Sequence, residues 1–204
     1  MCGASAATSA LSPTGMSVRN LSLSFLDAVA ERASASSPAA PAAAAAPVIF
    51  LDIDGVLNRT RTATHIRLEP DLVARLKAIV ASTHCEIVLS TFWRHFEEYI
   101  RYILHRYGIS GASVIGRTPG GALRECLATD PADEAQYRNR AAEIRAWLAA
   151  HPTVTKFAIL DDRGTASDEG LAAHFVQTKS DVGLTDDDVE RACAILTSVD
   201  LVWP

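Results

Sequence analysis

Two aspartates, Asp52 and Asp54, directly follow the apolar run of residues 48–51, and Gly55 stands behind the second. Carboxylates this close repel each other, and each needs water, a hydrogen-bond donor or a cation. Beside a phosphoryl group, one carboxylate can act as a nucleophile, while a second carboxylic acid can protonate the leaving alkoxide and then activate water. The pair therefore indicates phosphoryl-group chemistry assisted by a cation.

Two further apolar runs also end in side chains that can bind metal or phosphate. The polar residues at these ends are Ser90, Thr91, Asp161 and Asp162. Open α/β sheets bind ligands outside the carboxyl ends of their strands. Carboxylates from two strands supply the hard oxygen ligands that suit Mg²⁺, a cation that also binds substrate phosphate. The sequence thus predicts a Mg²⁺ site formed by Asp52, Asp54, Asp161 and Asp162.

The elements that must position these residues alternate along the chain. Strands are expected at residues 48–52, 86–90, 113–116, 156–162 and 174–178, and helices at 69–80, 96–107, 138–150 and 187–196. Pro70 suits a helix start, and Thr185 with Asp188 resembles a capping box. This order predicts the α/β class, with a Rossmann-like, mostly parallel sheet flanked by helices.

Composition separates two parts of the 204-residue chain. Residues 1–46 are rich in Ala, Ser and Pro and are expected to form a disordered tail, although a short helix at 16–32 or a weak organellar transit peptide are alternatives. Residues 47–204 form the expected domain and carry the whole net charge of −5, which argues against a broad basic surface for nucleic acid.

Cysteine usage and hydropathy bear on the compartment. The four cysteines are far apart and form no CxxC pair, so neither a thiolate metal site nor a disulfide framework is expected. No apolar run approaches the length of a membrane span. A reducing, cytoplasmic setting is the simplest interpretation, with the nucleus or an organelle as alternatives.

The stretches LDIDGVLN, LST and ILDD resemble the signature of the haloacid-dehalogenase (HAD) superfamily of phosphohydrolases. More narrowly, VLSTFWR, VIGRTP and HFVQTKSDVGLT resemble the phosphatase domain of Swiss Army Knife RNA repair proteins. The set is also similar to the 3′-phosphatase domain of phage polynucleotide kinases. The resemblance covers about residues 47–204 and implies a HAD fold and a Mg²⁺-dependent phosphatase.

The resemblance also implies roles for single residues. Asp52 would be the nucleophile that forms an aspartyl-phosphate, and Asp54 the acid/base, with its backbone carbonyl also on Mg²⁺. An aspartate at the second position disfavours the dehalogenase and transport-ATPase branches. Ser90 best fits the phosphate-binding hydroxyl, with Thr91 as its rival. Asp161 and Asp162 would complete the metal site.

The basic residue expected to neutralise the phosphoryl oxygens is Arg140, with Arg138 as the alternative, since the usual lysine is absent from this predicted helix. Arg94 is a further candidate for binding substrate phosphate or for pairing with a surface acid. Arg117 and Arg163 are weaker candidates.

Simpler interpretations stand beside these roles. Ser90 and Thr91 could cap the following helix, and Asp161 and Asp162 could form an ordinary acidic turn. Phe92 and Trp93 could stack on a nucleobase, but core packing is favoured for such large aromatics, and Trp147 is expected in the core.

The spacing of the motifs limits any inserted cap domain. The 35 residues between Asp54 and Ser90 and the 48 between Thr91 and Arg140 leave no room for a large one. An open site suits a phosphate on a macromolecule, such as an RNA or DNA end. A protein or small-molecule phosphatase and a non-catalytic binding module of the same fold are the alternatives. No kinase or ligase motif accompanies the domain, so repair partners are expected to act in trans.

Overall fold

The computed structural model describes residues 45–61, 63–121, 139–201 and 203. The predicted tail, apart from residues 45 and 46, lies outside these residues, and so does Arg138. All the described residues belong to one compact unit. Ala45 already packs against a hydrophobic cluster of this unit, slightly before the predicted start of the domain at residue 47.

Five parallel strands form the sheet in the order β3-β2-β1-β4-β5. Their bounds are β1 Val48–Leu51, β2 Glu86–Leu89, β3 Val114–Arg117, β4 Phe157–Asp161 and β5 Phe175–Gln177. Each predicted strand is present, shifted or shortened by one or two residues. The central strand β1 is buried along its whole length, as expected for a parallel sheet with both faces covered. The α/β prediction is therefore confirmed.

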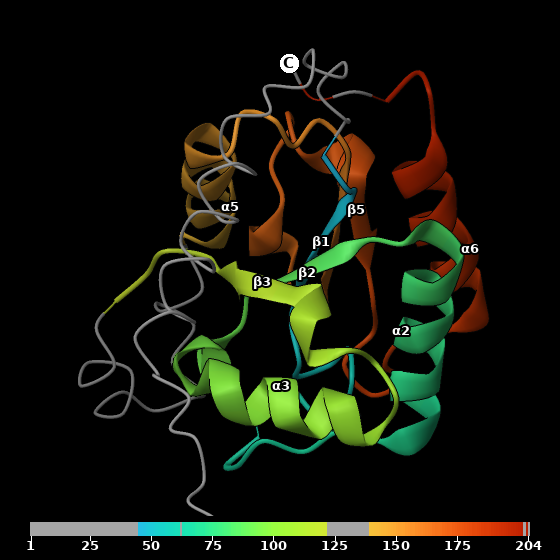
Figure 1. The fold of residues 1–204 in the computed structure, drawn as a ribbon. Coiled ribbons are helices and arrows are strands. Elements are labelled where there is room, and N and C mark those ends of the chain that lie inside the picture. Colours follow the sequence, from blue (N-terminus) through green and yellow to red (C-terminus); the bar gives the residue numbers. More distant parts are fainter. Residues whose placement is uncertain (1–44, 62, 122–138, 202, 204) are drawn as a thin grey trace, which may run out of the picture. The chain divides into compact units, whose positions relative to one another are not determined.

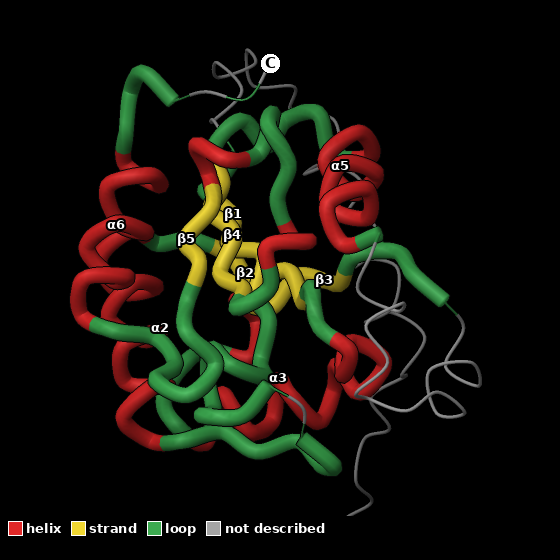
Figure 2. Tube along the Cα trace, turned by 180° about the vertical axis from the view of Figure 1, so that it is seen from behind, coloured by secondary structure: helices red, strands yellow, loops and turns green. Residues whose placement is uncertain are grey.

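Helices cover both faces of the sheet (Figures 1 and 2). They are α2 Pro70–Thr83, α3 Glu97–Arg106, α5 Arg140–Ala150 and α6 Asp186–Thr197. Ile49 and Leu51 of β1 face a cluster shared with α2, α3 and α6, whereas Val48 and Phe50 face a cluster shared with α5. This alternation follows from the two-residue period of a strand, and it fixes β1 between two hydrophobic layers.

Local signals place the helix ends. Pro70 occupies the first turn of α2, and the side chain of Thr185 accepts a hydrogen bond from the backbone N–H of Asp188 in the predicted capping box of α6. Gly108 has a φ of +84° just after α3, a conformation that favours glycine. The helix predicted at 96–107 covers only 97–106, because Phe96 belongs to the preceding 3₁₀ helix and Tyr107 is the C-cap.

The connection between β1 and α2 bears on the expected absence of a cap. Its described residues, 52–61 and 63–69, contain no helix or strand. No helix in the described part of the chain is long and apolar enough to cross a membrane.

Candidate active site

Strand register brings the predicted polar residues to one edge of the sheet. Leu51 pairs with Leu89 of β2 and with Leu160 of β4. The next residues, Asp52, Ser90 and Asp161, are therefore level with one another at the carboxyl ends of three adjacent strands. The backbone N–H of Asp52 donates to the Leu160 carbonyl at 2.9 Å, and that of Ser90 to the Leu51 carbonyl at 2.9 Å. The sheet thus assembles the site.

Three of the predicted aspartates form a tight cluster. Carboxylate oxygens of Asp52, Asp161 and Asp162 all lie within 4.8 Å of one another, and all three residues are buried. Burial raises the pKa of Asp161 well above its ordinary value, although the Arg140 guanidinium opposes the shift. Burial also raises the pKa of Asp162, against a lowering hydrogen bond from Ser180. Negative charge is therefore costly here unless a cation balances it.

Arg140 is the first residue of α5, and its guanidinium brings positive charge to this cluster. Its Nη1 donates to Asp161 Oδ2 at 2.8 Å and lies 3.2 Å from Asp52 Oδ2. It also donates to the backbone carbonyl of Ser90. The Arg140 side chain is only 3% exposed. The predicted arginine is thus held against the carboxylate predicted to be the nucleophile.

Two buried oxygens mark where a ligand fits. Ser90 Oγ and Asp162 Oδ1 have no hydrogen-bond partner among the described residues. Arg163 Nε lies 3.9 Å from Asp162 Oδ1, and Asp162 Oδ2 accepts from Ser180 Oγ at 2.6 Å. Buried polar atoms without partners are costly, and water, an ion or substrate can satisfy them. The donor set of three carboxylates with one unpartnered oxygen fits a hard divalent cation.

The two rival hydroxyls differ in the structure. Thr91 Oγ1 accepts a hydrogen bond from the backbone N–H of Trp93 at 3.3 Å and caps the 3₁₀ helix Phe92–Phe96. Ser90 Oγ makes no such bond within the described part of the chain. Both residues are buried. The geometry therefore favours Ser90 over Thr91 for binding phosphate and gives Thr91 the capping role.

Gly55 permits the close packing of this edge. Its φ is +71°, and a Cβ atom built on it would lie 2.6 Å from Asp162 Cγ. Any side chain at this position would strain the backbone and displace the Asp162 carboxylate. The glycine behind the aspartate pair thus lets β1 turn and also leaves space for the third carboxylate.

Asp54 lies apart from the acidic cluster and has different partners. Its Oδ1 accepts from Asn58 Nδ2 at 2.7 Å, and its Oδ2 accepts from the Ala63 backbone N–H and from Trp93 Nε1, both at 3.1 Å. Burial raises its pKa, with a smaller contribution from the charge of Asp52, although the Asn58 bond opposes the shift. Its carboxylate does not join the three-carboxylate group, so its place among the metal ligands stays a prediction.

Arg94 is paired within the protein. Its Nη1 lies 2.6 Å from Glu143 Oε2 of α5, and both side chains are largely buried. A Cβ atom on Gly120 would lie 2.1 Å from Arg94 Nη2, so the glycine accommodates the guanidinium. Burial raises the pKa of Glu143, and the charge of Arg94 opposes this shift. Phosphate binding by Arg94 stays a prediction.

The weaker candidates have structural contacts. Arg117 Nη1 donates to the Arg94 carbonyl at 3.3 Å. Arg163 Nη2 donates to the Arg61 carbonyl at 3.2 Å, and its backbone N–H donates to Asp161 Oδ1 at 2.8 Å. Trp93 and Trp147 are 7% and 6% exposed, which confirms that both pack mainly in the interior.

Several supporting residues were not predicted. Asn58 follows Asp54 by four residues, so its proximity was a usable signal for a local hydrogen bond. Ser180 and Glu143 reach Asp162 and Arg94 only through the fold. No local pattern in the sequence connects either of these pairs.

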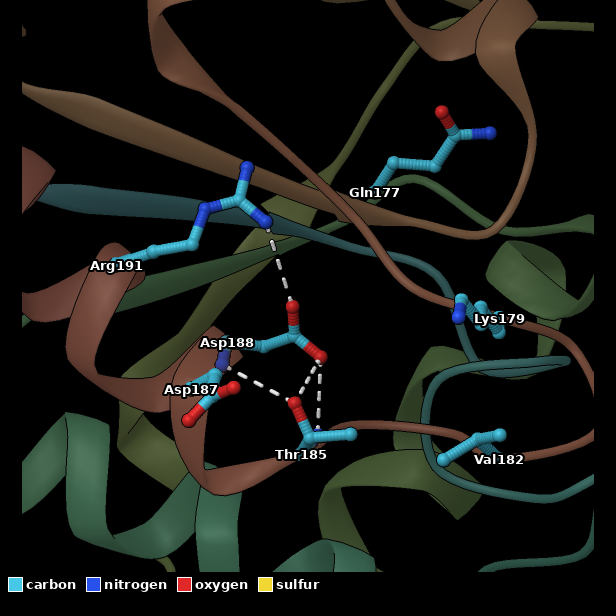
Figure 3. Close-up of a pocket in the computed structure, with 7 residues that line it drawn as sticks. All are labelled: Gln177, Lys179, Val182, Thr185, Asp187, Asp188 and Arg191. Atoms are coloured by element: carbon cyan, nitrogen blue, oxygen red, sulfur yellow. Dashed lines mark hydrogen bonds and ion pairs between the residues drawn. The ribbon is translucent and has the colours of Figure 1, made fainter.

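A separate pocket of about 390 Å³ lies at the end of β5 and the start of α6. Figure 3 shows its lining, with Asp188 facing Thr185 and Arg191. The Asp188 carboxylate accepts from the Thr185 backbone and hydroxyl, and Arg191 Nη1 lies 3.6 Å from it. Asp188 thus serves the capping of α6, and none of the clustered aspartates lines this pocket.

Family comparison agrees with the site geometry. Residues 48–189 match the model of the HAD domain in Swiss Army Knife RNA repair proteins. The chain belongs to this family. Its membership indicates a phosphohydrolase of the HAD type, and the buried aspartate cluster is compatible with Mg²⁺. Comparison with curated proteins and with solved structures finds no match.

The match spans every element of the HAD domain that carries a predicted site residue. It begins at the first residue of β1 and ends within α6. It therefore includes the acidic strand ends, Ser90, the α5 arginine and the capping box. The predicted resemblance and the predicted fold are both confirmed.

Proposed function

We propose that this HAD domain is a Mg²⁺-dependent phosphatase that hydrolyses an accessible phosphomonoester, such as the phosphorylated end of a nucleic acid. The cluster of Asp52, Asp161 and Asp162, with oxygens within 4.8 Å of one another, carries this proposal. Three buried carboxylates, of which Arg140 contacts Asp52 and Asp161, favour binding of a further cation. A phosphate ester bound to that cation would lie beside Asp52.

In the first step, a carboxylate oxygen of Asp52 attacks phosphorus as the bond to the leaving oxygen breaks. Asp54 gives its proton to the leaving alkoxide, and the product is an aspartyl-phosphate on Asp52. Burial and the nearby Asp52 charge keep the pKa of Asp54 raised, which favours the protonated acid that this step requires. Arg140 neutralises charge beside the attacked phosphoryl group, and Ser90 Oγ donates to one of its oxygens.

In the second step, the Asp54 carboxylate takes a proton from water as the water oxygen attacks phosphorus. Inorganic phosphate leaves, and Asp52 returns as a carboxylate. The hydrogen bonds from Asn58 and Trp93 hold Asp54 in place for both proton transfers. One residue thus serves as acid and then as base.

Asp52, Asp161 and Asp162 would hold the cation, together with the Asp54 backbone carbonyl as the family resemblance implies. When bound, Mg²⁺ would balance the carboxylate charge and polarise the phosphoryl group. Asp162 Oδ1, which lacks a hydrogen-bond partner in the described residues, is the ligand atom best prepared for it.

A substrate panel tests this function. The wild-type chain with Mg²⁺ is compared with Asp52→Asn on RNA and DNA carrying 3′- or 5′-phosphates, phosphopeptides and sugar phosphates. We expect phosphate release from nucleic-acid ends by the wild type alone. Faster turnover of phosphopeptides or sugar phosphates would assign a different substrate class. No turnover of any substrate would indicate a binding module that retains the fold.

A further inference from the structure

A second hollow, of about 350 Å³, lies beside the candidate active site. It is lined by Thr64, His65, Ile66, Trp93, Phe96 and Tyr99. Phe96 and Tyr99 are 37% and 52% exposed, so both rings offer apolar surface to a ligand. The Trp93 and Phe96 rings lie 6.2 Å apart between centroids. The hollow therefore has the size and aromatic lining of a small-ligand pocket.

Both walls of this aromatic pocket are anchored on Asp54. The first wall begins after Ala63, whose backbone N–H donates to Asp54 Oδ2 at 3.1 Å. The second wall includes Trp93, whose Nε1 donates to the same oxygen at 3.1 Å. The pocket thus adjoins the carboxyl group that protonates the leaving oxygen in the proposed reaction.

This position determines which part of the substrate the pocket can receive. The phosphoryl group must lie at Asp52, and the leaving oxygen must reach Asp54. The organic group attached to that oxygen therefore extends past Asp54, toward the pocket. Aromatic rings stack on planar groups with little dependence on sequence, as they do on nucleobases.

We propose that the pocket binds the nucleobase of the terminal nucleotide, the one that carries the phosphate to be removed. This proposal rests on the proposed phosphatase function. Phe96 and Tyr99 supply the exposed ring surface, while Trp93 forms the inner wall and links the pocket to Asp54. Stacking of the base in this pocket would bring the leaving oxygen next to Asp54, its proton donor.

The surroundings of the pocket add no binding site for the neighbouring phosphates of a strand. A neighbouring hollow shares Phe96 and Tyr99 and is also lined by Glu97, Glu98 and Arg117. Its two carboxylates outnumber its single guanidinium, so it offers no net positive charge to the next phosphates of a strand. The pocket should therefore contribute similarly to nucleoside monophosphates and to longer ends.

The test compares two nucleotides with a phosphomonoester that carries no base. Hydrolysis of adenosine 3′-monophosphate and adenosine 5′-monophosphate is measured against glycerol 2-phosphate, which has no ring. For the better adenosine isomer, Tyr99→Ala and Phe96→Ala should lower the ratio of its kcat/KM to that of glycerol phosphate by about 5- to 150-fold. Tyr102→Ala is the matched control, because Tyr102 is 58% exposed on the same helix and does not line the pocket.

An unchanged ratio in both pocket variants would overturn the proposal, as would an equal fall for Tyr102→Ala. A phosphotyrosine peptide turned over faster than the nucleotides, and equally sensitive to Tyr99→Ala, would assign the pocket to protein substrates instead. If the wild type hydrolyses no substrate, the phosphatase function fails. Calorimetric binding of adenosine 3′-monophosphate to the wild type and to Tyr99→Ala then decides the pocket alone, and equal affinities would refute it.

Discussion

Aspartates at the carboxyl ends of the strands and aspartates on the surface respond in opposite ways to their surroundings. Burial raises the pKa of Asp161 and Asp162. On the surface, hydrogen bonds lower the pKa of Asp71 and Asp186, with Arg59 as the partner of Asp71 and Arg75 as the partner of Asp186. The same chemical group is therefore costly to ionise in one region and easy to ionise in the other.

This contrast shows where charged groups affect the stability of the domain. The surface pairs are solvated and contribute little to stability. The clustered carboxylates are desolvated and repel one another, and Arg140 offsets only part of this cost. Such a cluster lowers stability unless a ligand compensates it, which is typical of functional sites.

The largest effect on activity is expected from substitution of Asp52 or Asp54. Asp52→Asn should reduce turnover of aryl phosphates below detection, because the amide cannot form the aspartyl-phosphate. Asp54→Asn should lower the rate by about 10²- to 10⁴-fold, and less for substrates with very good leaving groups. Mass spectrometry of Asp54→Asn should detect phosphate trapped on Asp52. Equal residual activity in both variants without an adduct would mean that the two carboxylates only bind metal.

Metal removal should have the next largest effect, and it should act on the aspartates at the strand ends and leave the surface aspartates unaffected. EDTA should abolish aryl phosphate hydrolysis, and Mg²⁺ should restore it. In chelator, Asp162→Asn should increase the free energy of unfolding by about 1 kcal/mol, because it removes a desolvated charge beside Asp52. Mg²⁺ should stabilise the wild type against heat more than it stabilises this variant. Full activity in EDTA would contradict the metal assignment.

The two rival hydroxyls provide a sharper test within the site. Ser90→Ala should lower kcat/KM by about 10- to 100-fold, since a hydroxyl without a partner among the described residues would lose its bond to a charged phosphate. Thr91→Val should lower the unfolding free energy by about 1 kcal/mol through loss of the cap, with a smaller effect on kcat/KM. The reverse pattern would assign phosphate binding to Thr91.

The smallest effect is expected on the surface. Asp186→Asn removes the partner of Arg75 Nε, at 2.7 Å, but its side chain is 82% exposed. The midpoint of thermal unfolding and the kcat/KM of this variant should equal those of the wild type within error, at low and at high salt. A midpoint shift as large as that of Asp162→Asn would show that the contrast between the two regions does not hold.

The sequence determined the arrangement of the elements because hydrophobic periodicity is a local property. The apolar run at β1, the stripe of α2 and the capping box of α6 were all predictable within a few residues. The meeting of Asp52, Ser90 and Asp161 was also predictable, since the carboxyl ends of parallel strands share one edge. The 3₁₀ helix at Phe92–Phe96 was not predicted, although a cap from Ser90 or Thr91 to the following helix was one of the alternatives.

Only the tertiary structure decided which hydrogen-bond partner each side chain at the carboxyl edge of the sheet has. Ser90 and Thr91 are adjacent in sequence, but Arg140 of the distant helix α5 donates to the Ser90 carbonyl, and the Ser90 hydroxyl has no partner among the described residues. Trp93 was expected in the core, yet its ring nitrogen contacts Asp54 across 39 positions of the chain. Residue types were enough to identify these groups as candidates. Their partners could not be predicted, because these hydrogen bonds and the desolvation depend on distances between segments remote in sequence.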